Sequence, residues 1–174
     1  EKMQEGLVNA YKDSGFLPEW ASPGHRGCMV GNNSASVVAD AYVKGIRGYD
    51  IETLWEAVKH GANAVHPHVP SSGRLGWDWY NRLGYVPCDV GINESAARTL
   101  EYAYDDWCIY RMAESLGNKE VADEYYQRAL RYRNLLDPGT GFFRGRDSQG
   151  NWRVPFNPNA SSRDYTEATA WQYR

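Results

Sequence analysis

The chain has 174 residues and a formal net charge of −3, and its 19 lysine and arginine residues are scattered along it. A small charge without a basic cluster excludes an electrostatic nucleic-acid surface. No apolar run approaches the roughly 20 residues that a membrane span needs. The length suits one domain with a hydrophobic core.

Both ends of the chain carry helical sequence. Residues 1–7 read as a helix already under way, and the chain stops at 171–174, directly after what reads as the start of another helix. Domains usually end in exposed linkers. We therefore interpret residues 1–174 as a piece of a longer protein.

Aromatic residues make up 14% of the chain, with 7 Trp and 13 Tyr. Such rings suit stacking on sugar faces with hydrogen bonds at the ring edge, and they equally suit the packing of long helices. The composition leaves both interpretations open.

Two short helices are predicted in the first third. Apolar and small residues at three-to-four spacing predict a helix over 34–46, with Asn33 or Ser34 as the N-cap. Asp50 is the expected N-cap of a second helix, which Gly61 ends. Periodicity then fails over 66–89, where prolines and glycines alternate with large rings, so we expect a long ordered loop.

Helical periodicity returns at Glu94 and continues to Leu116–Gly117, and Asn118 is expected to cap a further helix that runs to Leu136. The short connection predicts antiparallel neighbours. Residues 137–141 break the chain, and 142–154 predict a β-hairpin around 148–150. A loop over 155–165 leads to a helix expected to begin near Glu167.

Paired antiparallel helices with alternating short and long connections predict an all-α fold. Because no sequence repeat recurs at a fixed period, an ordinary solenoid is disfavoured. We expect part of an (α/α)6 toroid, with long aromatic-rich loops, a small β-hairpin and an active centre where the loops gather.

A series of motifs, in this order and spacing, resembles glycoside hydrolase family 92. The resemblance covers essentially the whole chain and rests on Leu17-Pro18-Glu19-Trp20, Cys28-Met29-Val30-Gly31, Val38-Ala39-Asp40-Ala41-Tyr42-Val43-Lys44-Gly45-Ile46, Gly84-Tyr85-Val86-Pro87, Arg98-Thr99-Leu100-Glu101-Tyr102-Ala103-Tyr104-Asp105-Asp106-Trp107, Arg131-Tyr132-Arg133-Asn134, Gly141-Phe142-Phe143-Arg144 and Tyr165-Thr166-Glu167-Ala168-Thr169-Ala170-Trp171-Gln172-Tyr173.

The resemblance implies a Ca²⁺-dependent, inverting exo-α-mannosidase that removes terminal mannose from N-glycans or mannan outside the cytoplasm (secreted, periplasmic or at the cell surface). It places a β-sandwich before residue 1 and the general base after residue 174. On this interpretation 1–174 is a partial catalytic domain, inactive alone, whose partners are the glycan and the other parts of its own polypeptide.

Inverting hydrolysis needs a protonated acid at the leaving oxygen and a carboxylate that activates water, about 6.5–9.5 Å apart. The resemblance assigns the acid to Glu167, which Tyr165 and Trp171 flank in sequence. Apolar neighbours favour the protonated form of a carboxyl group. Without the resemblance, a glutamate in the first turn of a helix is the simpler explanation.

Glu94 is the rival acid, because it also begins a helix after the aromatic loop. We assign it to binding a sugar hydroxyl, with a helix-start glutamate as the alternative. Asp105 and Asp106 are not a catalytic pair, because adjacent helical positions point about 100° apart. Asp106 is expected to be a buried partner for an arginine.

The mannose subsite is assigned to Trp20, His25 and Arg26, which lie in a loop rich in proline and glycine. A surface histidine without function is the alternative for His25. Calcium takes six to eight oxygen ligands, and by resemblance only Gln172 contributes one here.

Two other functions stay open. The first is a different inverting toroid hydrolase that acts on α-glucosides without calcium. The second is a catalytically inert helical segment that binds glycan.

Overall fold

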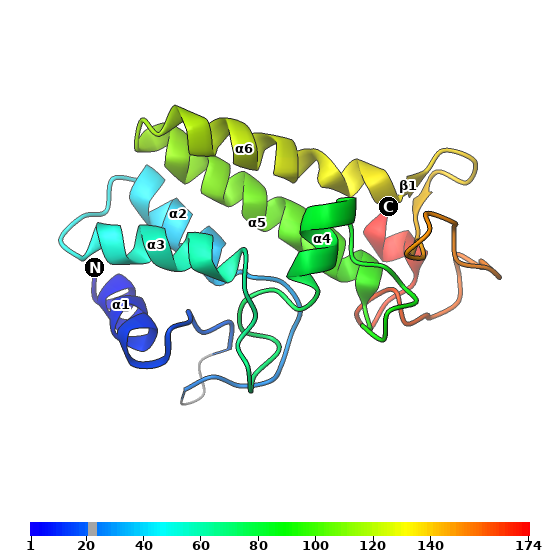
Figure 1. The fold of residues 1–174 in the computed structure, drawn as a ribbon, viewed down its shortest axis with the longest axis horizontal. Helices are drawn as coiled ribbons and strands as arrows, with labels where there is room; N and C mark the ends of the chain where they lie inside the picture. Colours follow the sequence, from blue (N-terminus) through cyan, green and yellow to red (C-terminus); the bar gives the residue numbers. More distant parts are fainter. Residues whose placement is uncertain (21–23) are drawn as a thin grey trace.

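In a computed structural model that describes residues 1–20 and 24–174, helices make up about half of the chain, which ends in a loop-rich region with a two-stranded sheet (Figure 1). The elements in chain order are α1 (Lys2–Ser14), α2 (Ser34–Val43), α3 (Ile51–Gly61), α4 (Trp77–Leu83), α5 (Ser95–Ser115), α6 (Lys119–Ala129), the 3-10 helix η1 (Leu130–Leu135), β1 (Leu136–Asp137), β2 (Phe142–Phe143) and the 3-10 helix η2 (Ala170–Tyr173).

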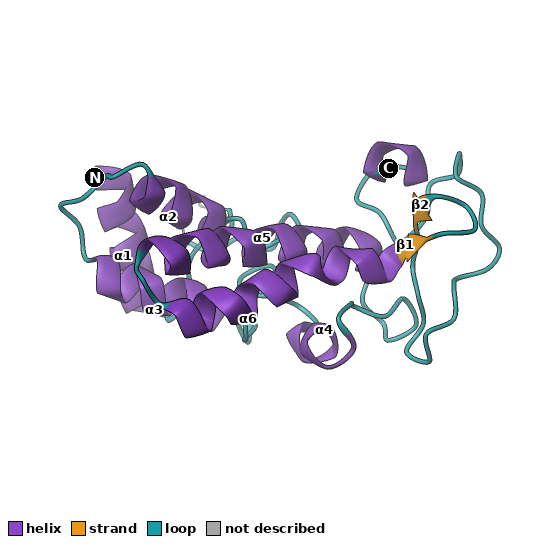
Figure 2. Ribbon diagram, turned by 90° about the horizontal axis from the view of Figure 1, so that it is seen from above, coloured by secondary structure: helices purple, strands orange, loops and turns teal. Residues whose placement is uncertain are grey.

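The predicted antiparallel pair is confirmed as α5 and α6, which run side by side in both views (Figures 1 and 2). Gly117 turns the chain with a φ of 74°, and the Asn118 side chain accepts a hydrogen bond from the Val121 amide at 3.2 Å. The helix predicted to reach Leu136 changes to 3-10 geometry at Leu130.

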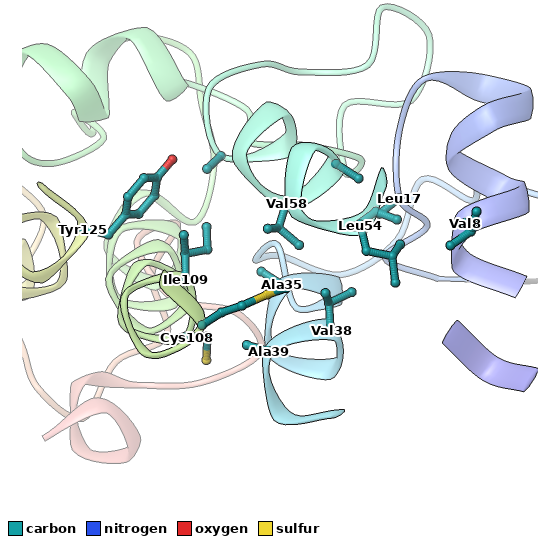
Figure 3. Packing of buried hydrophobic residues seen from close by; sticks show 13 residues of the cluster. Val8, Leu17, Ala35, Val38, Ala39, Leu54, Val58, Cys108, Ile109 and Tyr125 are labelled. Carbon is teal, nitrogen blue, oxygen red and sulfur yellow. The ribbon is translucent and has the colours of Figure 1, made fainter. Parts of the chain in front are cut away.

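An aliphatic core joins α1, α2, α3 and α5 at one end of the molecule. The side chains in Figure 3 converge between these helices, and the most deeply buried include Val38, Leu54, Val58, Ile109 and Met112. A separate cluster lies at the other end, where Tyr85, Ala96, Leu135, Phe142, Tyr165 and Ala170 pack together. A third, smaller cluster is formed by Tyr80, Val86 and Tyr102, so the described residues form three apolar clusters.

The two predicted short helices are present, with one correction. Asp50 caps α3 through the Thr53 amide at 3.0 Å, and this bond lowers the pKa of Asp50 to about 2. Asn33 occupies the N-cap position of α2 with no capping side-chain bond. The Glu19 carboxylate caps α2 instead, because it accepts from both the amide and the hydroxyl of Ser34 at 2.8 and 2.7 Å.

The prediction of one continuous loop over 66–89 is wrong, because the seven-residue helix α4 lies within it. Gly76 and Gly84 bound this helix, and both have left-handed backbone angles. Two turns are too few for an apolar periodicity to show, which explains the error.

The prediction of a hairpin over 142–154 is also wrong, because the two paired strands are β1 and β2. The sheet pairs Leu136 with Phe143 and Asp137 with Phe142, across the turn at 138–141. At the predicted hairpin only one bridge forms, between Arg146 and Trp152.

The helix expected near Glu167 begins instead at Ala170 and is a single 3-10 segment. Thr169 starts it with a capping box, so Glu167 lies outside the helix. Closure of an (α/α)6 ring stays a prediction, since the described residues show the α5–α6 pair with α1–α3 packed at its end. Among the described residues no helix has the length and apolarity to cross a membrane.

Candidate active site

Glu167 is exposed and has a φ of 50°, a left-handed conformation that is uncommon for a residue with a side chain. No described side chain forms a hydrogen bond or ion pair with its carboxylate. Since Glu167 precedes η2 rather than beginning it, the explanation of this glutamate as a first-turn helical residue does not hold.

The backbone beside Glu167 is fixed by three contacts. The Tyr165 hydroxyl donates to the Phe143 carbonyl oxygen at 2.6 Å, and the Thr166 amide donates to the Tyr173 hydroxyl at 3.3 Å. The Asp164 carbonyl oxygen accepts from the Ala97 amide in the first turn of α5. Burial, opposed by the nearby Arg144 guanidinium, raises the pKa of Tyr165 to about 12, so its hydroxyl stays a donor. These contacts hold the segment while the Glu167 carboxylate stays free.

Asp164 anchors this segment through its side chain as well. Its buried carboxylate accepts from the Ser95 hydroxyl at 3.1 Å and from Arg153 Nε at 3.0 Å. A Cβ on Gly145 would overlap that carboxylate, so this position requires glycine. Neither Asp164 nor Arg153 was predicted from the sequence to be part of the site.

Glu94 lies next to the Glu167 segment. It is the N-cap residue of α5 with a φ of 61°, and its amide donates to the carbonyl oxygen of Arg163. Its carboxylate pairs with Arg98 Nη2 at 3.2 Å. Unlike Glu167, Glu94 is therefore already partnered.

Gln172 uses its amide oxygen within the fold. Gln172 Oε1 accepts from the amide and the hydroxyl of Thr169 at 2.8 and 2.7 Å, which occupies both lone pairs. Among the described residues no group of three or more His, Cys, Asp or Glu side chains could hold a metal ion. Calcium binding by Gln172 stays a prediction, and it would require these capping bonds to open.

The three residues assigned to mannose lie in the loop before α2. Trp20 is 41% exposed and Arg26 is exposed, so both can reach a ligand. The two ring nitrogens of His25 contact the hydroxyls of Ser14 at 2.7 Å and Ser72 at 3.0 Å. Burial and the neighbouring His66 lower the pKa of His25. A sugar would have to displace one of these serines, so the binding role of His25 stays a prediction.

Below this loop lies a buried polar network. Glu19 Oε1 accepts a hydrogen bond from the side-chain Nδ2 of Asn32 at 2.8 Å. The backbone N–H of Asn32 donates to Asp105 Oδ2 at 2.7 Å. Burial raises the pKa of Glu19 and raises that of Asp105 well above its usual value, although Arg74 nearby opposes both shifts. Glu19 and Asn32 thus fasten the loop that carries Trp20 to the middle of α5.

The prediction for Asp106 is confirmed. It is fully buried and binds Arg74 Nη1 at 2.6 Å, Arg128 Nε at 3.3 Å and the Tyr80 hydroxyl at 2.8 Å. The two guanidinium groups make this a structural charge cluster inside the helical part.

The expected site residues thus fall into two groups along α5. Glu94, Glu167 and Gln172 lie around its first turn, whereas the Trp20 loop is fastened at Asp105. Eleven residues of helix separate Glu94 from Asp105, which is about 16 Å along the axis. No hydrogen bond or ion pair among the described residues joins the two groups directly.

The family model of the glycosyl hydrolase family 92 catalytic domain matches residues 1–174. The chain belongs to glycosyl hydrolase family 92. The family GH92 inverting mannosidase BT2199 of Bacteroides thetaiotaomicron VPI-5482 is similar in structure, with a TM-score of 0.93 and 50% identity over 97% of this chain and 23% of its own. The family GH92 α-mannosidase BT3965 of Bacteroides thetaiotaomicron has a TM-score of 0.88 and 38% identity over 98% of this chain and 22% of its own.

A curated relative, named an uncharacterized secreted glycosidase of Arthroderma benhamiae, is 32% identical over 167 residues, which cover 84% of this chain and 21% of the relative. The chain therefore spans between a fifth and a quarter of the length of these family 92 relatives.

The sequence gives a partial indication of the residues that anchor the Trp20 loop. Glu19 stands in the Leu17-Pro18-Glu19-Trp20 motif, and Asn32 follows the next family 92 motif. Asn32 stands two residues before the predicted helix start and is a candidate cap. Nothing local shows that it reaches α5, 73 residues further along, or that Glu19 caps α2 from 15 residues upstream.

Proposed function

We propose that this chain is part of an inverting exo-α-mannosidase in which Glu167 is the general acid. The observation that carries the proposal is the free carboxylate of Glu167 on a segment fixed at Asp164, Tyr165 and Thr166. Half of the sequence is identical to that of a solved inverting mannosidase of the same family, which supports the reaction class.

In the proposed reaction Glu167 donates its proton to the leaving glycosidic oxygen as the bond to the sugar breaks. A carboxylate outside residues 1–174 accepts a proton from the attacking water on the opposite face, which inverts the anomeric centre. Fixing the acid beforehand lowers the entropic cost of reaching the reactive geometry. Trp20 and Arg26 offer an exposed ring and a planar donor group to the sugar, with His25 and Glu94 as further candidates.

We include Ca²⁺ and an extracytoplasmic location in the proposal. When bound, the ion would hold sugar hydroxyls with ligands drawn mainly from other segments of the polypeptide, because the oxygen of Gln172 is engaged in its capping box. The word "secreted" in the name of the Arthroderma benhamiae relative supports export. The substrate class we propose is an N-glycan or mannan with terminal α-mannose.

The test uses the intact polypeptide that carries this chain, with α-linked mannobiose as substrate. We expect Glu167→Gln to lower kcat by about 10²–10⁴-fold, the range for loss of general acid catalysis. Glu94→Gln is the matched control and should raise KM with a much smaller change in kcat. Full activity in Glu167→Gln would reject the acid assignment.

The same preparation separates the two other functions. Hydrolysis of α-glucosides in the presence of a chelator, without hydrolysis of mannosides, would identify a glucosidase. Glycan binding without turnover by the wild type would identify a binding segment.

A further inference from the structure

A cavity of about 240 Å³ lies beside the segment that carries Glu167. It is enclosed by the loop over 155–162, by Arg144 and Arg153, and by Asp164 and Tyr165. Tyr165 stands two residues before Glu167, and none of the residues assigned to mannose lines the cavity.

The polar side of this cavity offers hydrogen-bond donors. Arg153 uses Nε for Asp164 and Nη2 for the Cys88 carbonyl oxygen, and Nη1 has no protein partner among the described residues. The Ser162 hydroxyl oxygen accepts from the Asp164 amide at 3.2 Å, which leaves its O–H free to donate. Arg144 Nε also has no hydrogen-bond partner, but it is buried, so the donors open to the cavity are those of Arg153 and Ser162.

Most of the remaining wall is apolar, and Asn157 and Ser161 complete the lining. Pro155, Phe156, Ala160 and Tyr165 supply the apolar part, and Phe156 is kept in place by the Arg144 guanidinium 4.2 Å from its ring centroid. A ring-bearing wall with a few fixed donors at one side suits a sugar ring, which has an apolar face and a polar edge.

The charges of the lining residues and the volume of the cavity restrict the class of ligand that it can bind. Arg144 pairs with Asp137 at 2.6 Å and Arg153 pairs with Asp164 at 3.0 Å, so neither guanidinium has an uncompensated charge for an anion. The cavity volume of about 240 Å³ leaves room for a ligand of the size of one sugar ring.

We propose that this cavity is an accessory subsite that binds one neutral pyranose of the glycan, other than the mannose whose bond is cleaved. This inference deepens the proposed function and rests on it, since it assigns the cavity to the same substrate.

Ala160 allows a test that leaves the fold intact, because it is exposed on the rim of the cavity. Ala160→Trp fills the cavity, and Gln149→Trp, which adds the same ring at an exposed position that does not line the cavity, is the matched control. KM and kcat are measured on the intact polypeptide with mannotriose and with 4-nitrophenyl α-mannoside, which has one sugar only. Binding of mannotriose is measured by calorimetry in the Glu167→Gln background.

We expect Ala160→Trp to raise KM for mannotriose about tenfold, equivalent to about 1.4 kcal/mol, while kcat/KM for the aryl mannoside and all constants of Gln149→Trp stay unchanged. An unchanged KM, or equal losses on both substrates, would overturn the subsite. If the wild type cleaves no mannoside, the proposed function fails and calorimetry decides the cavity alone. Loss of mannotriose binding in Ala160→Trp then supports the subsite, and absent or unaltered binding rejects it.

Discussion

The two ends of this molecule are held together in different ways. At the helical end, aliphatic side chains from α1, α2, α3 and α5 pack into one core (Figure 3). Over 136–174, arginine and tyrosine side chains instead bind backbone carbonyl oxygens: Arg144 binds Arg153, Arg146 binds Gly150, and Tyr165 binds Phe143. Burial of apolar area is the main stabilising contribution in the first region, whereas the second combines a smaller apolar cluster with directional hydrogen bonds that position its loops.

The largest loss of stability is expected from the buried charge cluster in the helical part. Asp106→Asn removes the one carboxylate bound to Arg74 and leaves Arg128 with only the exposed Glu124, and removing one partner of a buried pair costs about 3–5 kcal/mol. Urea unfolding measures this, with the exposed Asp123→Asn as control. A loss no larger than that of the control would show that the cluster is not a buried charge network.

A slightly smaller loss is expected from the aliphatic core. Leu54 is fully buried between α3 and its neighbours, and Leu54→Ala should lower the free energy of unfolding by about 3 kcal/mol. The same urea titration with Leu100→Ala, which lies outside this core, serves as comparison. Equal losses for the two variants would contradict the extent of the core.

In the loop-rich region we expect a small loss of stability with a larger effect on activity. Tyr165→Phe removes one hydrogen bond to the Phe143 carbonyl oxygen and should cost about 1 kcal/mol. Because this bond fixes the Glu167 segment, kcat on mannobiose should fall as well. Tyr110→Phe removes an exposed hydroxyl contact with Glu114 and is the control. An unchanged kcat in Tyr165→Phe would show that the hydrogen bond from Tyr165 to Phe143 does not contribute to catalysis.

The smallest expected effect is a change in how the free energy of unfolding depends on pH. The folded-state pKa values of Asp105 and Glu19 are raised, so the folded chain binds more protons than the unfolded chain above about pH 4. Stability should therefore fall as pH rises from the unfolded pKa toward the folded one. Asp105→Asn should flatten this decrease, and its stability relative to wild type should increase from pH 4 to pH 7.

The lowered pKa of His25 acts in the opposite direction near pH 6.5, because the folded chain then binds fewer protons. It acts equally in wild type and Asp105→Asn and cancels in the difference between them. An identical slope in both proteins would contradict a raised pKa of Asp105 in the folded chain.

The difference between the two regions also explains what the sequence could predict. Helices α2, α3, α5 and α6 follow from apolar periodicity, with Asp50 and Asn118 as local caps. The β1–β2 pairing and the place of Glu167 depend on arginine and tyrosine side chains that reach backbone atoms far along the chain, such as Tyr165 to Phe143. Apolar periodicity does not predict such contacts, because it indicates only local structure.

The candidate site divides in the same way. Glu167 was identified because a family motif contains it, whereas Asp164 and Glu19 were missed because their roles depend on partners in other elements. For Gln172, the local motif that suggested a metal ligand also supplies the capping box that engages its oxygen.

The dependence of rate on the leaving group tests the central assignment most directly. The measurement compares kcat/KM of wild type and Glu167→Gln on mannobiose and on 2,4-dinitrophenyl α-mannoside, whose leaving group needs no proton. If Glu167 is the general acid, the variant loses about 10²-fold or more on mannobiose and retains most activity on the dinitrophenyl substrate. Equal losses on the two substrates would contradict that role.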